Sequence, residues 1–294
     1  MIEKNQKIIA LLETSLIKPN VGLDEVYDRI IRYYNRSNQI IEKASEEDKL
    51  ELDKILPANF LQKKDLVGSF SYLRTEPIRT MAIDFPIHLK LDKRNRKTIM
   101  VCAMDSLPPN DEKAEIRNAI YKDSNGIIPW APFSIIYNWD LAKGSSKLNI
   151  DFFRTLFKEC DLYVTDIYKM FFRTGPIGSD VRSNTLPRYV TENLDAHRAI
   201  LEKEIEIINP DIILTLGNNS RNALYSLYKL KPEKWGDDYQ DAVWTDTAKK
   251  IISIPHISGA ANGAKVKILS NPKYKSVLGA NNEKLANIVL SIVK

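Results

Sequence analysis

The sequence predicts an α/β protein built around a mainly parallel sheet, and three observations support this. From about residue 79, short runs rich in β-branched residues alternate with longer stretches of helical periodicity. Four of these runs have the length and composition of buried strands, at residues 98–103, 162–165, 212–216 and 251–254. Each run ends at a polar or turn-forming segment. We therefore expect three layers around a central four-stranded sheet, with a helical region added at the N-terminus.

The first 75 residues differ in character from the rest of the chain. They are rich in Leu, Ile, Glu and Lys, and apolar residues recur at helical spacing, as at Ile8, Leu11 and Leu12. Pro19 and Pro57 interrupt the pattern, which predicts three or four helices. No residue pattern typical of catalysis occurs here. We expect an accessory helical region at 1–75 packed against an α/β domain at 76–294.

Within the α/β domain, further elements follow from local pattern. An alternating run at 81–89 predicts one edge strand, because Pro86 lacks the N–H that an inner strand requires. Helical periodicity predicts helices at 151–159, 191–208, 218–228 and 281–293.

Composition limits the classes of function. The two cysteines, Cys102 and Cys160, are too few for a disulfide framework or a four-cysteine cluster. No apolar run is long enough for a secretion signal or a membrane span, so we expect a soluble, cytoplasmic protein. The net charge of +5 is compatible with a polyanionic partner but does not require one. Basic runs at 90–97, 173–188 and 265–275 are typical of solvated faces, or of surfaces that meet phosphates.

Three chemically capable residues follow predicted strands. Asp105 and Asp166 stand at the ends of the first two runs, and His256 follows the fourth directly after Pro255. Because the carboxyl ends of parallel strands share one edge, these side chains are predicted to converge there. A carboxylate and a histidine together can activate water and stabilise a leaving anion. Each also has a purely structural interpretation, as a turn residue, a cap or a satisfied strand-end histidine.

Five segments in this order resemble the uracil-DNA glycosylase superfamily over roughly residues 97–293. The first strand runs into 103–107, where Asp105 matches the catalytic aspartate of the family's water-activating motif. Pro132-Phe133 matches the pair whose phenylalanine stacks on the base, and 165–169 resembles Thr-Asn-x-x-Lys. The segment 201–217 is similar to the family's helix followed by P-x-x-I-x-x-L-G, and 256–259 resembles the HPS-type motif.

The resemblance implies a DNA glycosylase that hydrolyses the N-glycosidic bond of a flipped uracil or modified base, with no metal or organic cofactor. Asp105 would activate water, and His256 would stabilise the leaving base. Phe133, Asp166 and Met104 would bind the base. It also implies a double- or single-stranded DNA partner. We further expect no membrane partner, because no long apolar run occurs, and a monomer. The residues expected to contact DNA are Ser258, Gly259, Asn262, Lys265, Lys267 and Lys169.

The chain departs from the family at several positions. It lacks the cysteines of the iron-sulfur branch, and Ile257 replaces the proline of a strict HPS motif. Asp166 stands where the family usually has asparagine. Asparagine both donates and accepts, which suits uracil, whereas an ionised carboxylate only accepts. The base therefore stays open, as do two alternatives: a diverged nucleic-acid or nucleotide binding module of the same fold, and a hydrolase of free nucleosides or nucleotides.

Overall fold

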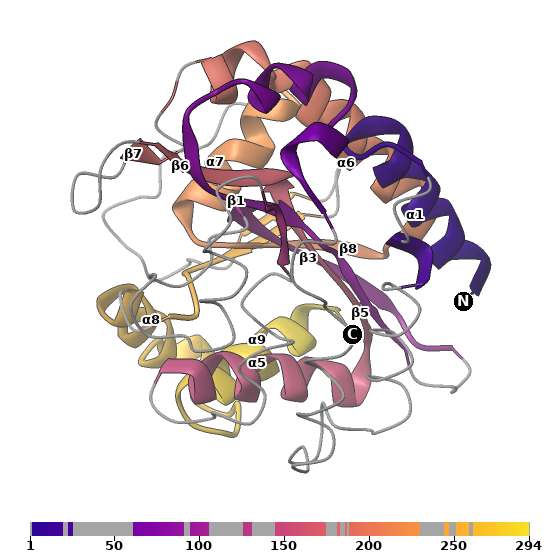
Figure 1. Ribbon diagram of the computed structural model, residues 1–294. Helices are drawn as coiled ribbons and strands as arrows, with labels where there is room; N and C mark the ends of the chain where they lie inside the picture. The colour runs from indigo at the N-terminus through magenta and orange to yellow at the C-terminus, as the bar shows by residue number, and fades with distance from the viewer. Residues whose placement is uncertain are drawn as a thin grey trace, which may run out of the picture.

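The part of the chain that the structure describes forms two β-sheets with helices packed around them (Figure 1). This computed structural model describes residues 2–19, 23–25, 61–90, 95–105, 126–130, 145–174, 181–182, 186, 188–229, 244–246, 251–258 and 261–293. The larger sheet has the strand order β2-β5-β3-β8-β10-β9, and the smaller one has the order β4-β1-β6-β7.

The four predicted core strands are neighbours in the larger sheet. They are β5 (Asp161–Tyr168), β3 (Thr98–Asp105), β8 (Ile212–Leu216) and β10 (Ile251–Ile254), and they run parallel to one another. Two antiparallel strands flank them, β2 (Ile87–Leu89) and β9 (Trp244–Asp246). The α/β prediction is confirmed. The central sheet was predicted to have four strands, whereas in the described residues it has six, since β2 and β9 add one strand at each edge.

The smaller sheet contains β1 (Ile78–Asp84), β4 (Ile128–Trp130), β6 (Met170–Thr174) and β7 (Val181–Arg182). The single edge strand predicted at 81–89 is wrong. Phe85-Pro86 divides it into β1 and β2, which belong to different sheets. The chain changes sheets again between β5 and β6. These two crossings lie together, since the Asp84 N–H donates to the Lys169 carbonyl at 2.8 Å.

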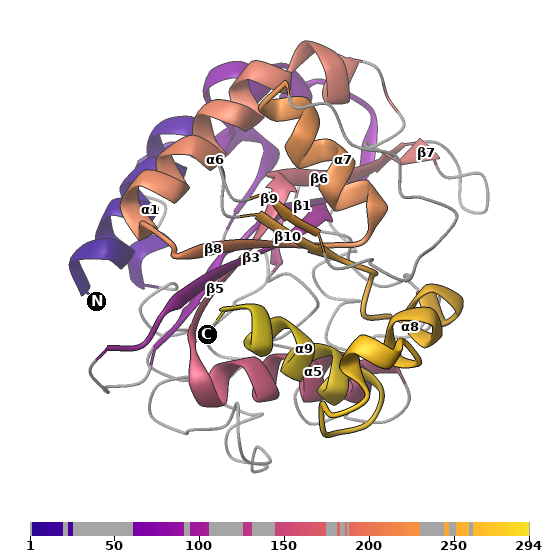
Figure 2. The ribbon, with the colours of Figure 1, turned by 180° about the vertical axis from the view of Figure 1, so that it is seen from behind.

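Helices lie on both sides of the larger sheet (Figures 1 and 2). On one side are α1 (Ile2–Ser15), α6 (Leu194–Ile208) and α7 (Asn218–Leu227). On the other are α5 (Ser145–Glu159), α8 (Asn262–Leu269) and α9 (Asn281–Val293). Short 3₁₀ and π turns occupy Lys63–Asp65, Gly68–Arg74, Arg188–Glu192 and Pro272–Tyr274.

The four helices predicted in the α/β region are all present. Two of them begin elsewhere than predicted: the helix predicted from 151 begins at Ser145, and the one predicted from 191 begins at Leu194, after the π turn. None of the helices in the described ranges is long and apolar enough to cross a membrane.

The N-terminal helix packs on the α/β region. Ile8 and Leu12 of α1 are fully buried, and the Lys4 ammonium donates to the Ile208 carbonyl at the end of α6 at 2.6 Å. Residues 26–60 lie outside the described ranges, so the predicted number of N-terminal helices and the domain boundary near residue 75 remain predictions.

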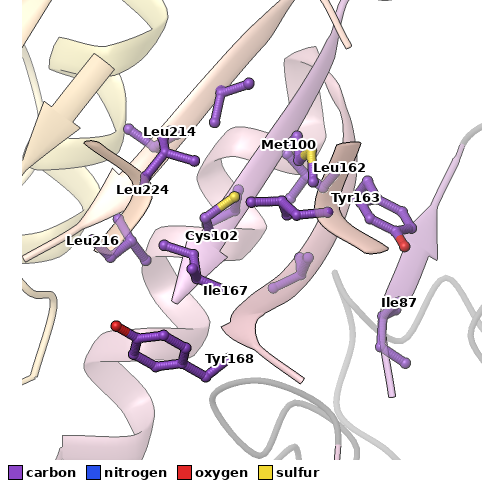
Figure 3. Packing of buried hydrophobic residues seen from close by; sticks show 14 of the residues in the cluster. Ile87, Met100, Cys102, Leu162, Tyr163, Ile167, Tyr168, Leu214, Leu216 and Leu224 are labelled. Carbon is purple, nitrogen blue, oxygen red and sulfur yellow. The ribbon is translucent and has the colours of Figure 1, made fainter. Parts of the chain in front are cut away.

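Most side chains of the central strands are apolar, and they lie on both faces of the sheet. Met100, Cys102, Leu162, Tyr163 and Leu214 are completely buried (Figure 3). Parallel strands covered on both faces require this composition, which is why continuous apolar runs identified them in the sequence. Asp105 and His256 stand at the carboxyl edge of this buried sheet.

Candidate active site

The strand register brings the backbones of the predicted catalytic residues to one edge of the sheet. Asp105 is the last residue of β3 and pairs with Tyr168 at the end of β5. Ile254 ends β10 beside Leu216, and His256 follows two residues later. Asp105 and His256 therefore both stand at the carboxyl ends of parallel strands, where open α/β sheets bind their ligands. The side chain of Asp105 is outside the described set, so its aim into a shared pocket stays a prediction.

His256 is held in one tautomer by its own loop. The Ser258 N–H donates to His256 Nδ1 at 3.1 Å, and the Ser258 hydroxyl lies 2.7 Å from the same nitrogen. Since Nδ1 accepts the backbone bond, the proton of the neutral ring resides on Nε2. Burial and the Lys265 cation both lower the pKa of His256, which favours that neutral form. The ring is thus prepared to donate one hydrogen bond from Nε2.

Gly217 makes room for this histidine. It follows β8 with φ of +90°, and its N–H donates to the Ile254 carbonyl at 2.8 Å. A Cβ at this position would lie 3.1 Å from His256 Cβ. The glycine is needed both for its backbone conformation and for this close approach.

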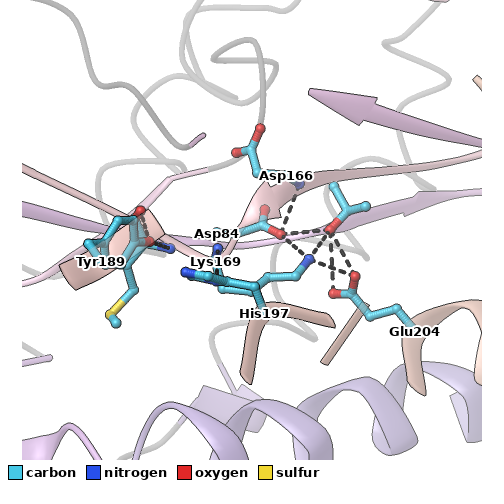
Figure 4. Close-up of polar contacts among 8 residues, drawn as sticks. Asp84, Asp166, Lys169, Tyr189, His197 and Glu204 are labelled. Atoms are coloured by element: carbon cyan, nitrogen blue, oxygen red, sulfur yellow. Dashed lines mark hydrogen bonds and ion pairs between the residues drawn. The ribbon is translucent and has the colours of Figure 1, made fainter. Parts of the chain in front are cut away.

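Asp166 lies above a buried charge network. Thr165 faces α6, where its hydroxyl bonds to Glu204 at 3.2 Å. Because successive side chains of a strand alternate, Asp166 points to the opposite face, away from the Lys169 ammonium (Figure 4). Its backbone N–H donates to Asp84 Oδ2 at 3.0 Å. Asp166 is fully buried, and its contact with a base edge stays a prediction.

The network itself joins two carboxylates through one lysine. Lys169 Nζ lies 2.9 Å from Asp84 Oδ2 and 2.6 Å from Glu204 Oε2, and all three side chains are fully buried. Burial lowers the pKa of Lys169, but Asp84 and Glu204 more than offset this and raise it overall. Burial raises the pKa of Glu204 to about 7, against the opposing effect of Lys169. The network anchors the crossing between the two sheets beneath Asp166.

Of the two other residues predicted to contact the base, the structure describes Met104 but not Phe133. Met104 is half-buried and packs against the core one residue before Asp105. Phe133 lies outside the described residues, but β4 ends three residues earlier at Trp130, which pairs with Asp84. The strand that leads toward Phe133 is thereby tied to the carboxylate that holds the Asp166 backbone.

Two predicted DNA contacts are wrong. Lys169 is fully buried in the network, and Lys265 is only 4% exposed, so neither ammonium is available to a phosphate. Asn262 and Lys267 are exposed on α8, in keeping with a surface role, whereas Ser258 bonds to His256. Gly259 lies outside the described residues.

Sequence reasoning missed Asp84, Glu204 and Asn282. Two of them carried a signal. Glu204 is the acidic member of the apolar stripe formed with Ile200 and Ile208, and Asp84 interrupts an apolar run. An acidic residue in such a position implies a buried partner. Asn282 lacked a comparable signal, because asparagine is common in the first turn of a helix.

Among residues with described side chains, no group of three His, Cys, Asp or Glu residues is placed to hold a metal ion. Cys102 and Cys160 are both buried free thiols. Burial raises the pKa of Cys160 and, more strongly, that of Cys102. Neither thiol is prepared for nucleophilic chemistry.

Comparison with protein families agrees with this geometry. A family model described as Uracil DNA glycosylase superfamily matches residues 118–278. The match spans β5, α6, β8, β10 and α8, and so includes Asp166 and His256, while Asp105 precedes it. The match covers more than half of the chain. The chain therefore belongs to the uracil-DNA glycosylase superfamily. A search of curated proteins found no match.

Proposed function

We propose that this protein is a DNA glycosylase that hydrolyses the N-glycosidic bond of a flipped uracil or modified base. The observation that carries the proposal is His256, held with Nε2 protonated at the carboxyl edge of the sheet. A neutral imidazole donor at this position suits a base that leaves as an anion. The superfamily match over Asp166 and His256 supports the same reaction.

The proposed reaction uses two residues at the edge. Asp105 orients a water molecule and accepts its proton as the water oxygen bonds to C1′ of the sugar. The bond between C1′ and the base nitrogen breaks, and its electron pair leaves with the base. His256 stabilises the resulting anion through the hydrogen bond from Nε2. Hydrogen-bond donors of this kind typically accelerate a reaction about 10²- to 10³-fold.

DNA as the substrate is supported by exposed basic residues that follow His256. Lys267, Lys273 and Lys275 are all exposed in and after α8. Such residues position a nucleic acid through its phosphates without reading its sequence. Extrusion of the nucleotide costs a few kcal/mol, least for a mispaired or damaged base.

The experiment that tests this function is a panel of oligonucleotides that carry single uracil or modified bases, in single- and double-stranded form. Alkali then cleaves every abasic site that the protein produces. We expect at least one base to be released, and His256→Leu to slow its release about 100-fold or more. Lys203→Gln is the matched control, because Lys203 is an exposed residue of α6 and should leave the rate unchanged.

One observation favours a second candidate function. Asp166, in place of the family's asparagine, is compatible with a pocket that has lost catalysis and only binds. Salt-sensitive DNA binding with no base released from any oligonucleotide would support that binding module. Release of base from free nucleosides but not from DNA would instead identify a nucleoside hydrolase.

A further inference from the structure

Lys265 is buried directly behind the loop that carries His256. It lies on α8 and is only 4% exposed. Its ammonium donates to the Ile257 carbonyl at 2.9 Å and to the Asn282 side-chain oxygen at 3.2 Å. The main chain between His256 and Ser258 is therefore tied to a helix that begins six residues after the histidine.

Asn282 completes this attachment from α9. It is fully buried, and its amide donates to the Ile257 carbonyl at 2.7 Å and to the Leu148 carbonyl at 2.9 Å. The Ile257 carbonyl thus accepts from two side chains at once. Ile257 is also the residue that replaces the proline of the family's motif. A proline restricts the backbone through its ring, whereas here two buried donors supply a restraint.

We propose that Lys265 and Asn282 are positioning residues of the candidate active site. Together they fix the main chain that orients His256, and Lys265 also supplies a buried positive charge near the anion that forms when the base leaves. The second part rests on the proposed glycosylase function. The fixing of the main chain at His256 does not depend on that function, because it concerns the orientation of the histidine alone.

The charge distribution around His256 supports this role. The Lys265 ammonium bonds to neutral oxygens, so no carboxylate among these contacts cancels its charge. Strand β10 contributes no charged residue, and the turn after β8 presents Gly217 and Asn218. Asp105 ends β3 at the same edge. Burial lowers the pKa of His256, and among the described groups Lys265 is the cation that lowers it further, which favours the neutral ring.

The test is an NMR titration of His256 in the full chain, which has three histidines. Burial, with smaller effects from nearby lysines, lowers the pKa of His88 to about 4 and that of His197 to about 3. The signal that disappears in His256→Leu identifies the third histidine. We expect Lys265→Met to raise the titration midpoint of His256, because the substitution removes the cation that lowers its pKa. The control Lys267→Met removes an exposed charge of the same helix and should leave the midpoint unchanged. Asn282→Leu retains the cation, so it should loosen the Ser258 bond to Nδ1 with little change in midpoint.

Equal midpoints in Lys265→Met and Lys267→Met would overturn the proposal. If Lys265→Met does not fold, Lys265→Gln removes the charge while keeping a donor. The unmodified protein provides a check that needs no variant, because a His256 midpoint at or above about 6.5 contradicts the proposed field. A raised midpoint in a protein that releases no base would refute the glycosylase function and leave the positioning role intact.

Discussion

Two lysines are buried beside the candidate site, and their partners differ in charge. Lys169 lies between Asp84 and Glu204, whereas Lys265 bonds to a carbonyl and an amide oxygen. The pKa of Lys169 is raised overall by its carboxylates, while burial lowers the pKa of Lys265. From this difference we infer that Lys169 anchors the fold, because carboxylates cancel its charge, and that Lys265 acts on the neighbouring His256, because its partners are neutral.

The location of each lysine matches this difference. Lys169 stands where the chain passes from one sheet to the other, far from solvent, and its ammonium also bonds to the Thr165 hydroxyl at 2.7 Å. Lys265 lies on α8 and bonds directly to the Ile257 carbonyl, in the loop of His256. Replacing Lys169 should therefore affect stability first, and replacing Lys265 should affect the histidine first.

The largest expected effect is that of Lys169→Met on stability. The substitution leaves Asp84 and Glu204 buried without their cation, which typically costs about 3–5 kcal/mol. Urea unfolding followed by circular dichroism measures the change. The control Lys203→Met breaks an exposed pair with Glu206 and should change stability by less than about 1 kcal/mol. Similar losses for both variants would show that the buried network does not anchor the fold.

The next largest effect is the pH dependence of stability, which tests whether Glu204 belongs to the buried network of Lys169. Burial raises the pKa of Glu204 to about 7, so the folded state holds this proton more tightly than the unfolded chain does. The free energy of unfolding should therefore fall between about pH 4.5 and 7, by as much as about 3 kcal/mol. Glu204→Gln should flatten that decline, as measured by urea unfolding at several pH values.

The matched control for this pH effect is Glu206→Gln. Glu206 is exposed, and the hydrogen bond and charge of Lys203 lower its pKa, so its contribution has the opposite sign. It should not flatten the decline. An unchanged pH dependence in Glu204→Gln would show that another group binds the proton.

The sequence predicted the central strands because their burial is a local property of the chain. An apolar run such as 251–254 must be covered on both faces, whatever covers it. The division of 81–89 into β1 and β2 was missed because Pro86 is compatible both with one edge strand and with a break between two. Whether the chain breaks at Pro86 depends on where β5 and β6 lie, because β2 pairs with β5 and β1 pairs with β6. The local sequence carries no information on those positions.

The sequence predicted one part of the candidate site, His256, but not the surroundings of the two buried lysines. His256 was identifiable because a proline and a small-residue loop follow an apolar run. The two lysines were misassigned to the DNA surface because a lysine is exposed by default. Their burial depends on distant partners: Asp84 lies 85 residues from Lys169, and Asn282 lies 17 residues from Lys265.

The smallest expected effect concerns Asp166, which connects the Lys169 network to substrate choice. Its backbone N–H bonds to Asp84, and its side chain points to the other face of the sheet. Asp166→Asn therefore alters the side chain while leaving the backbone bond in place. The amide would supply both the donor and the acceptor that uracil requires.

Activity on uracil relative to other bases should rise in Asp166→Asn by about 10- to 100-fold, since an unpaired buried polar group costs about 1–3 kcal/mol. The measurement is the initial rate of base release across the same oligonucleotide panel. Asp195→Asn, a neutralisation at a 91% exposed position of α6, controls for the change in net charge. Stability should be nearly unchanged in Asp166→Asn, in contrast to Lys169→Met, because the ion pairs beneath remain. If the variant and its parent prefer the same base, Asp166 does not contact the base edge, and the network beneath it supports only the junction of the two sheets.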